Sequence, residues 1–66
     1  MTPKYPDVHV QLTGEDGNAF FIMGRVARAL RRAGVSTEEI SAYYKEATAK
    51  DYNHVLQTTM RWVSWS

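Results

Sequence analysis

The chain has no cysteine, so it forms no disulfide bonds and offers no thiolate ligand to a metal. This absence also fits a reducing compartment. No run of 18 apolar residues is present, so the sequence encodes no transmembrane helix. The first six residues, with prolines at positions 3 and 6, lack the apolar segment of a signal peptide. We therefore expect a cytoplasmic protein that has no contact with a membrane.

An excess of charge of either sign is also lacking. Eight Lys and Arg residues oppose seven Asp and Glu residues among 66, for a net charge of +1. This balance argues against a nucleic-acid-binding surface over the whole molecule, although it leaves a local basic patch open. The length predicts one small domain over residues 1–66, with residues 1–6 as an extended arm. A core of this size supplies only about 3–5 kcal/mol net, so good packing or oligomerisation must add to it.

Combinations of residues typical of an active site are missing. The two histidines, His9 and His54, lack the spacing of a zinc site and would need further ligands. The turn over residues 14–18 contains two glycines but not the remaining residues of a phosphate-binding loop, and its two acidic residues would repel phosphate. Glu38 and Glu39 are adjacent and point in different directions, so helix capping explains them better than acid–base catalysis. We expect no enzyme activity, no metal and no cofactor.

The most strongly patterned stretch, residues 17–34, predicts a long helix. Asn18 suits its N-cap, and Gly34 suits the position after its C-cap. Gly24 lies in the helix interior, where glycine costs about 1 kcal/mol against alanine, and it therefore predicts the close approach of another element. The apolar residues recur at helical spacing along one side: Ile22, Met23, Val26, Ala27, Leu30 and Ala33. Most of the arginines lie off that side: Arg25, Arg28, Arg31 and Arg32.

Two further helices are marked by their first residues. Ser36 followed by Glu39 matches a capping box, in which the serine side chain and the glutamate side chain each bind the other residue's amide. The helix that it begins should fray near residues 48–50. Asp51 then predicts the N-cap of a third helix, which the threonines at 58 and 59 should end near residues 60–61.

The two ends of the chain favour strands. Apolar and polar residues alternate over residues 8–12, and in residues 61–66 Val63 and Trp65 would lie on one side of a strand and Trp62 on the other. Because a lone strand leaves its backbone groups unpaired, we expect the ends to pair within the chain or, failing that, between subunits. The predicted fold is α+β, with a short N-terminal β-strand, three α-helices and a short C-terminal strand or extended tail. The predicted core consists of Val8, Val10, Leu12, Ile22, Val26, Leu30, Ile40, Tyr43, Leu56 and Met60.

The large aromatic residues predict self-association. Phe20, Phe21, Trp62 and Trp65 exceed what one short chain can hide, and exposed aromatics beside arginine are typical of an interface. A homodimer would cover them and add the stability that a small core lacks. The alternative is that both tryptophans fold over helices of their own chain.

Residues 29–40 resemble the centre of a helix-turn-helix. Gly34 would end the first helix, Val35 would fill the corner, Ser36 would cap the second helix and Ile40 would pack back. Any corner between two helices can use these residues. The second helix, which would be the recognition helix, begins with threonine and two glutamates, and these negative charges would face bases and phosphates.

Four short motifs resemble a family of very small proteins of unassigned function in actinobacteria and their phages. These are Gly-Asn-Ala-Phe at 17–20, Gly-Arg-Val at 24–26, Ala-Gly-Val-Ser at 33–36 and Met-x-Trp-Val at 60–63. The resemblance covers nearly the whole chain. It implies a phage-related or prophage-related protein and brings no activity or site residue with it.

Two functions remain open. The first is a non-enzymatic protein-interaction module, in which Arg25, Arg28 and Arg32 form a docking strip for an acidic protein surface, unless these arginines are only the solvated side of a helix. The second is a DNA-binding regulator that places the same arginines on phosphates, with Thr37, Ser41 and Lys45 near the groove. The candidate binding residues are Arg25, Arg28, Arg31, Arg32, Trp62 and Trp65.

Overall fold

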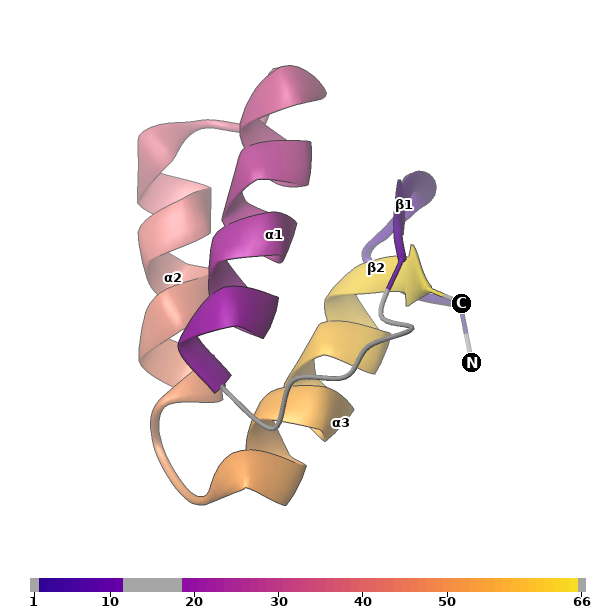
Figure 1. Cartoon of the computed structure of the whole chain (residues 1–66). Coiled ribbons are helices and arrows are strands. Elements are labelled where there is room, and N and C mark those ends of the chain that lie inside the picture. The colour runs from indigo at the N-terminus through magenta and orange to yellow at the C-terminus, as the bar shows by residue number, and fades with distance from the viewer. Residues whose placement is uncertain (1, 12–18, 66) are drawn as a thin grey trace.

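The elements follow the order strand, three helices, strand in a computed structural model that describes residues 2–11 and 19–65 (Figure 1). This order confirms the α+β prediction. Leu12, Asn18 and the turn at 14–18 lie outside the described residues, so the predictions made for them stay open. The elements are β1 (Tyr5–Val10), α1 (Ala19–Arg32), α2 (Thr37–Ala47), α3 (Tyr52–Trp62) and β2 (Val63–Trp65).

The two ends of the chain pair within the molecule, as a parallel two-stranded sheet. Parallel strands need a long crossover connection, and the three helices supply it. β1 begins at Tyr5, three residues earlier than expected, so Tyr5 belongs to the sheet and not to an extended arm. The register is irregular between Tyr5 and His9, where Pro6 has no backbone N–H to donate and its carbonyl instead accepts from Ser64 Oγ at 2.8 Å.

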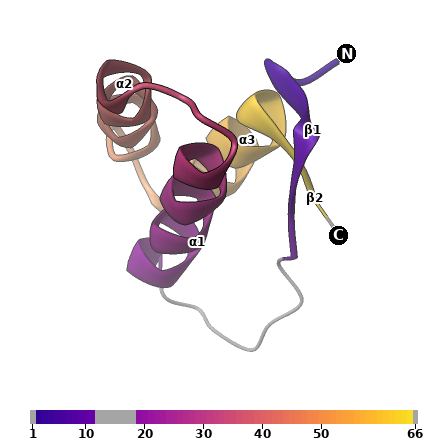
Figure 2. The same ribbon diagram turned by 90° about the horizontal axis from the view of Figure 1, so that it is seen from above.

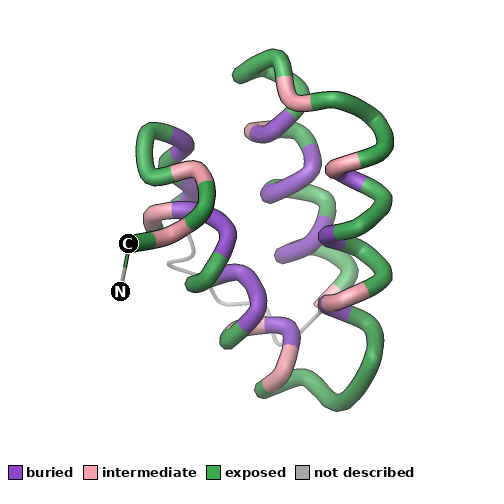
Figure 3. The backbone as a smooth tube through the Cα atoms, turned by 180° about the vertical axis from the view of Figure 1, so that it is seen from behind, coloured by how far each residue is buried: buried purple, intermediate pink, exposed green. Residues whose placement is uncertain are grey.

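The corner between α1 and α2 forms as its sequence predicts. Gly34 has φ +88°, a left-handed conformation that favours glycine. Its amide donates to Arg31 O at 3.1 Å, and the Val35 amide donates to Leu30 O at 3.0 Å, which together form a Schellman motif. Figures 1 and 3 show α1 and α2 side by side and running in opposite directions. This is an αα-hairpin, whereas the helices of a helix-turn-helix cross at about 90–120°.

The capping box at the start of α2 forms only in part. Ser36 Oγ accepts from the Glu39 amide at 3.2 Å, as predicted. The Glu39 carboxylate, however, does not return to the Ser36 amide. Its Oε1 accepts from Tyr5 Oη at 2.9 Å and lies 2.7 Å from Lys4 Nζ. The glutamate therefore ties α2 to the N-terminal strand, a long-range contact that a local motif does not predict.

Helix α3 differs from the prediction in the residue at which it ends and in the residues that it buries. Asp51 is its N-cap, as predicted, and the Asp51 side chain accepts from the His54 amide at 3.1 Å, but the helix continues to Trp62, one to two residues beyond the predicted end. The predicted core residue Met60 is 41% exposed. The buried side consists of Val55, Thr58, Thr59 and Trp62. The predicted core took Leu56 and Met60 from this helix, but Met60 is exposed and Leu56 is only partly buried.

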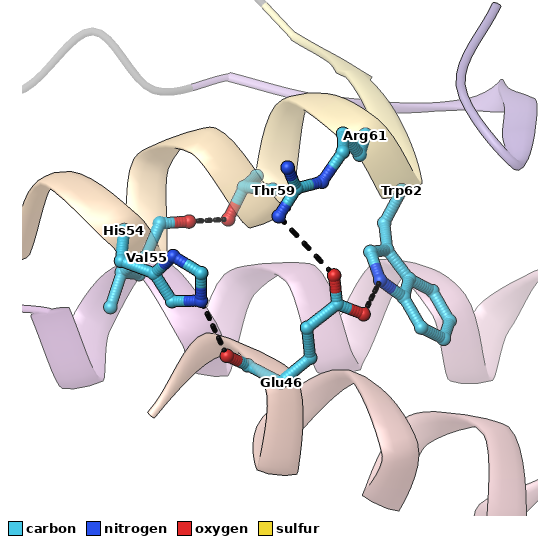
Figure 4. Close-up of polar contacts among 6 residues, drawn as sticks. All are labelled: Glu46, His54, Val55, Thr59, Arg61 and Trp62. Carbon is cyan, nitrogen blue, oxygen red and sulfur yellow. Dashed lines mark hydrogen bonds and ion pairs between the residues drawn. The ribbon is translucent and has the colours of Figure 1, made fainter. Parts of the chain in front are cut away.

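Trp62 is the residue on which β1, α2 and α3 meet. Its ring stacks on Tyr5 with centroids 5.9 Å apart and meets Tyr43 edge-on at 5.6 Å, while Lys4 Nζ lies 4.5 Å from its centroid. The indole Nε1 donates to Glu46 Oε1 at 3.0 Å (Figure 4). Only 5% of Trp62 is exposed, so the expectation that both tryptophans are available for an interface is wrong for this one.

A second set of contacts joins α2 to α3 around the same glutamate. Glu46 Oε2 pairs with Arg61 at 3.3 Å, and the Glu46 carbonyl lies 2.9 Å from His54 Nε2 (Figure 4). The buried residues face the space between the helices and the sheet, while the outer sides are exposed (Figure 3). The rest of the core comes from β1, α1, α2 and β2: Val8, Val10, Ile22, Met23, Val26, Ala27, Leu30, Ile40, Tyr43, Ala47 and Val63.

Candidate binding groove between the first strand and the first helix

An open groove of about 430 Å³ lies between β1 and α1. Residues 7–11 of the strand region form one wall. The opposite wall is one side of α1, with residues at helical spacing: Arg25, Arg28, Ala29, Arg32 and Ala33. Figure 2 shows the helix and the strand that carry these walls facing each other. We call this feature the basic groove.

The arginines of the basic groove differ in what they contact. Arg25 Nη1 donates to the carbonyl of Gln11 at 2.9 Å and so joins α1 to the chain just after β1. Within the part of the chain that the structure describes, Arg28 and Arg32 have no ion-pair partner. Asp7 is the one acidic residue among those that line the groove. The groove therefore carries three cationic side chains against one carboxylate and attracts anions.

The other predicted binding residues lie elsewhere. Arg31 is exposed on α1 but does not line the basic groove. Trp65 is 47% exposed on β2, where it pairs with Val10, and Trp62 is buried beneath the sheet. Arg25, Arg28 and Arg32, which the sequence grouped as a strip, share one wall of the basic groove, whereas the candidate residue Arg31 lies outside it.

Sequence reasoning missed the strand wall of the groove. A strand and a helix that follow each other in the sequence could pack in several ways, and only the fold brings residues 7–11 beside the arginines. The available signal was Ala29 and Ala33, which are small and continue the arginine side of the helix. Small residues there leave room beside the strand.

The exposed aromatics do not form one patch. Phe20 is 78% exposed and Phe21 58% exposed at the start of α1, and Trp65 belongs to β2. Figure 1 shows these two elements in different parts of the molecule. A homodimer stays a prediction, but one contact surface would not cover all three side chains.

A second hollow, of about 590 Å³, lies between the start of β1 and the α1–α2 corner, but two of its charged groups, Lys4 and Glu39, already pair with each other. The hydrogen bond from Lys4, and then that from Tyr5, lowers the pKa of Glu39. The same contacts with Glu39 raise the pKa of Lys4 and of Tyr5. These three groups stabilise the fold by joining β1 to α2, and so this hollow is a weaker candidate for ligand binding than the basic groove.

Metal binding finds no support around the groove, because residues 2–11 and 19–65 contain no cluster of three His, Asp or Glu side chains able to hold an ion. Among those same residues, no helix has the length and hydrophobicity to cross a membrane. The chemistry of the site is therefore that of guanidinium groups beside a strand. No known family, curated protein or solved structure significantly matches this chain.

Proposed function

We propose that this protein is a non-enzymatic interaction module that binds an acidic segment of a partner protein in the basic groove. The observation that carries the proposal is that Arg28 and Arg32 line one groove without an ion-pair partner among the described residues. Guanidinium groups bind carboxylates through paired hydrogen bonds, and such charge-assisted bonds are about twice as strong as neutral ones.

The DNA-binding alternative has less support. A recognition helix needs basic or polar residues at its start, whereas α2 begins Thr37-Glu38-Glu39. The antiparallel packing of α1 and α2 also differs from the crossing of a helix-turn-helix (Figure 1). The same arginines could contact phosphates, so the test must separate a protein partner from nucleic acid.

The test compares two neighbouring arginines of the last turn of α1. Arg32→Glu reverses a charge in the basic groove, and Arg31→Glu makes the same change outside it. Both variants alter the helix dipole interaction similarly, so Arg31→Glu is a matched control. In a pull-down from host lysate, the partner should survive nuclease treatment, be lost with Arg32→Glu and be kept with Arg31→Glu.

Two results would count against the module. The first is a signal that disappears with nuclease while the protein binds duplex DNA tightly in vitro, with affinity falling steeply between about 50 and 200 mM salt. The second is equal capture by Arg32→Glu and Arg31→Glu, because an interaction through the basic groove must distinguish them.

A further inference from the structure

The wall of the basic groove formed by β1 is the edge of a sheet. The sheet that the structure describes has two strands, and β1 pairs with β2 along one side. Five consecutive residues, 7–11, line the groove, so it runs along this strand. An edge strand is a template for the pairing of another strand. At the end of this edge, the Gln11 carbonyl already accepts a hydrogen bond from Arg25.

The spacing of the arginines matches an extended peptide. Arg28 and Arg32 are four residues apart on α1, and a helix rises 1.5 Å per residue, so they are separated by about 6 Å along its axis. Alternate residues of a strand point to the same side and lie about 6.7 Å apart. Two acidic residues at positions i and i+2 of an extended peptide would therefore reach both arginines.

We propose that the basic groove holds an acidic peptide in extended conformation, which adds to β1 as a third strand and places carboxylates at alternate positions on Arg28 and Arg32. This proposal rests on the proposed function and specifies how the acidic partner is bound. In strand addition, main-chain hydrogen bonds supply affinity and the side chains at alternate positions supply specificity. The groove between a strand edge and a helix provides both on this chain.

Other occupants match the groove less well. A second copy could offer its own β1, but Tyr5–Val10 contains only one acidic residue, Asp7, and cannot supply carboxylates at alternate positions. Nucleic acid would satisfy the arginines but has no peptide backbone to pair with the strand edge. An acidic peptide can pair its backbone with β1 and also place carboxylates on the arginines of α1.

The test uses a fluorescent peptide of alternating glutamate and threonine and two N-methylated forms of it. One form is methylated at every second amide, and the other is methylated at the amides between. A strand donates to its neighbour with alternate amides only, so the two forms should differ. One should bind about tenfold or more weakly than the parent peptide, since several hydrogen bonds are lost, and the other should bind about as well as the parent.

Variants and a competitor complete the experiment. Arg32→Glu should weaken binding of the parent peptide about tenfold, and Arg31→Glu should change it less than about twofold. Equal binding by both methylated forms, with the arginine difference kept, would overturn strand addition and leave the proposed function standing. Absence of parent binding up to about 1 mM, or tighter binding of a DNA duplex than of the peptide, would overturn both.

Discussion

At the scale of single residues, the two described glycines have opposite roles. Gly24 lies in the middle of α1, it is exposed, and a Cβ added there would meet no atom within 4 Å. The close approach inferred from the sequence is therefore wrong for the residues that the structure describes. Gly34 also has open space around it, but its φ of +88° disfavours any other residue.

Gly24→Ala should stabilise the protein by about 1 kcal/mol, because alanine has the higher helix propensity and lowers the entropy of the unfolded chain. Gly34→Ala is the control, and it should destabilise the protein by about 1 kcal/mol through backbone strain. Urea unfolding followed by circular dichroism measures both. A destabilised Gly24→Ala variant would mean that α1 has a close neighbour at this position.

Two adjacent threonines of α3 present a second contrast, since both are fully buried but only one is hydrogen-bonded. Thr59 Oγ1 donates to the Val55 carbonyl at 2.8 Å and lies 2.7 Å from Tyr43 Oη. Because its single hydrogen is used on Val55, Thr59 accepts the Tyr43 hydroxyl hydrogen. Thr58 Oγ1 has no hydrogen-bond partner in the part of the chain that the structure describes.

Thr58→Val should stabilise the protein by about 1 kcal/mol, because it replaces an unsatisfied buried hydroxyl by a methyl group of similar volume. Thr59→Val should destabilise it by about 1–3 kcal/mol, because the Tyr43 hydroxyl then loses its acceptor. Thermal or urea unfolding of the two variants gives the comparison. The same sign of effect for both substitutions would contradict the assigned hydrogen bonds.

At the scale of elements, Glu39 joins α2 to β1 through Lys4 and Tyr5. These contacts lower the pKa of Glu39 below its ordinary value of 4.5 in the folded protein. The ionised form is therefore favoured by folding, so the group stabilises the protein above about pH 4.5 and loses this effect as the pH falls through the lowered pKa.

Glu39→Gln should accordingly lower the free energy of unfolding at pH 7, and the difference from the original chain should shrink as the pH falls below 4.5 through the lowered pKa of Glu39. Glu38→Gln is the matched control, since Glu38 occupies the same first turn of α2 without contacting β1. Urea unfolding at a series of pH values provides the measurement. A difference that stays constant with pH would show that the Glu39 charge does not couple the two elements.

Elements that depend on local signals could be predicted, and those that depend on distant contacts could not. Gly34, Ser36 and Asp51 each mark a helix end within a few residues, so the three helices and the α1–α2 corner follow from the sequence. The burial of Trp62 depends on Tyr5 and Tyr43, which are far away in sequence. Local periodicity contains no information about such partners.

The candidate site also has one part that could be predicted from the sequence and one part that could not. Helical spacing brings Arg25, Arg28 and Arg32 to one side of α1 and could be read from the sequence. The wall of the groove formed by β1 could not be predicted from the sequence, because the parallel pairing of β1 with β2 is set by the whole fold. The sequence therefore predicted a basic strip, and the structure makes it one wall of a groove.

At the scale of the whole molecule, the core contains a tyrosine whose ionisation opposes folding. Burial raises the pKa of Tyr43 from 10.0 to about 12, despite its hydrogen bond with Thr59, which acts in the opposite direction. Between these values the unfolded chain loses the proton and the folded chain keeps it. Stability is therefore fully present below about pH 10 and declines as the pH rises towards 12.

The melting temperature should fall steadily from about pH 10 upwards, and absorbance of tyrosinate should show that Tyr43 keeps its proton in the folded protein until the pH approaches about 12. Tyr43→Phe should start from a lower stability, because it loses the hydrogen bond to Thr59, but it should decline less with pH. A variant that declines as steeply as the original chain would assign the alkaline instability to other groups.

The central claim is that the basic groove is the binding surface of this molecule. Amide chemical shifts of the labelled protein, followed during titration with the alternating glutamate peptide, test it most directly because they report the site for each residue. We predict shifts concentrated at residues 7–11 and along the side of α1 that carries Arg25, Arg28 and Arg32. Shifts concentrated on α2, on the exposed aromatics of α1 and β2, or nowhere at saturating peptide would contradict the account.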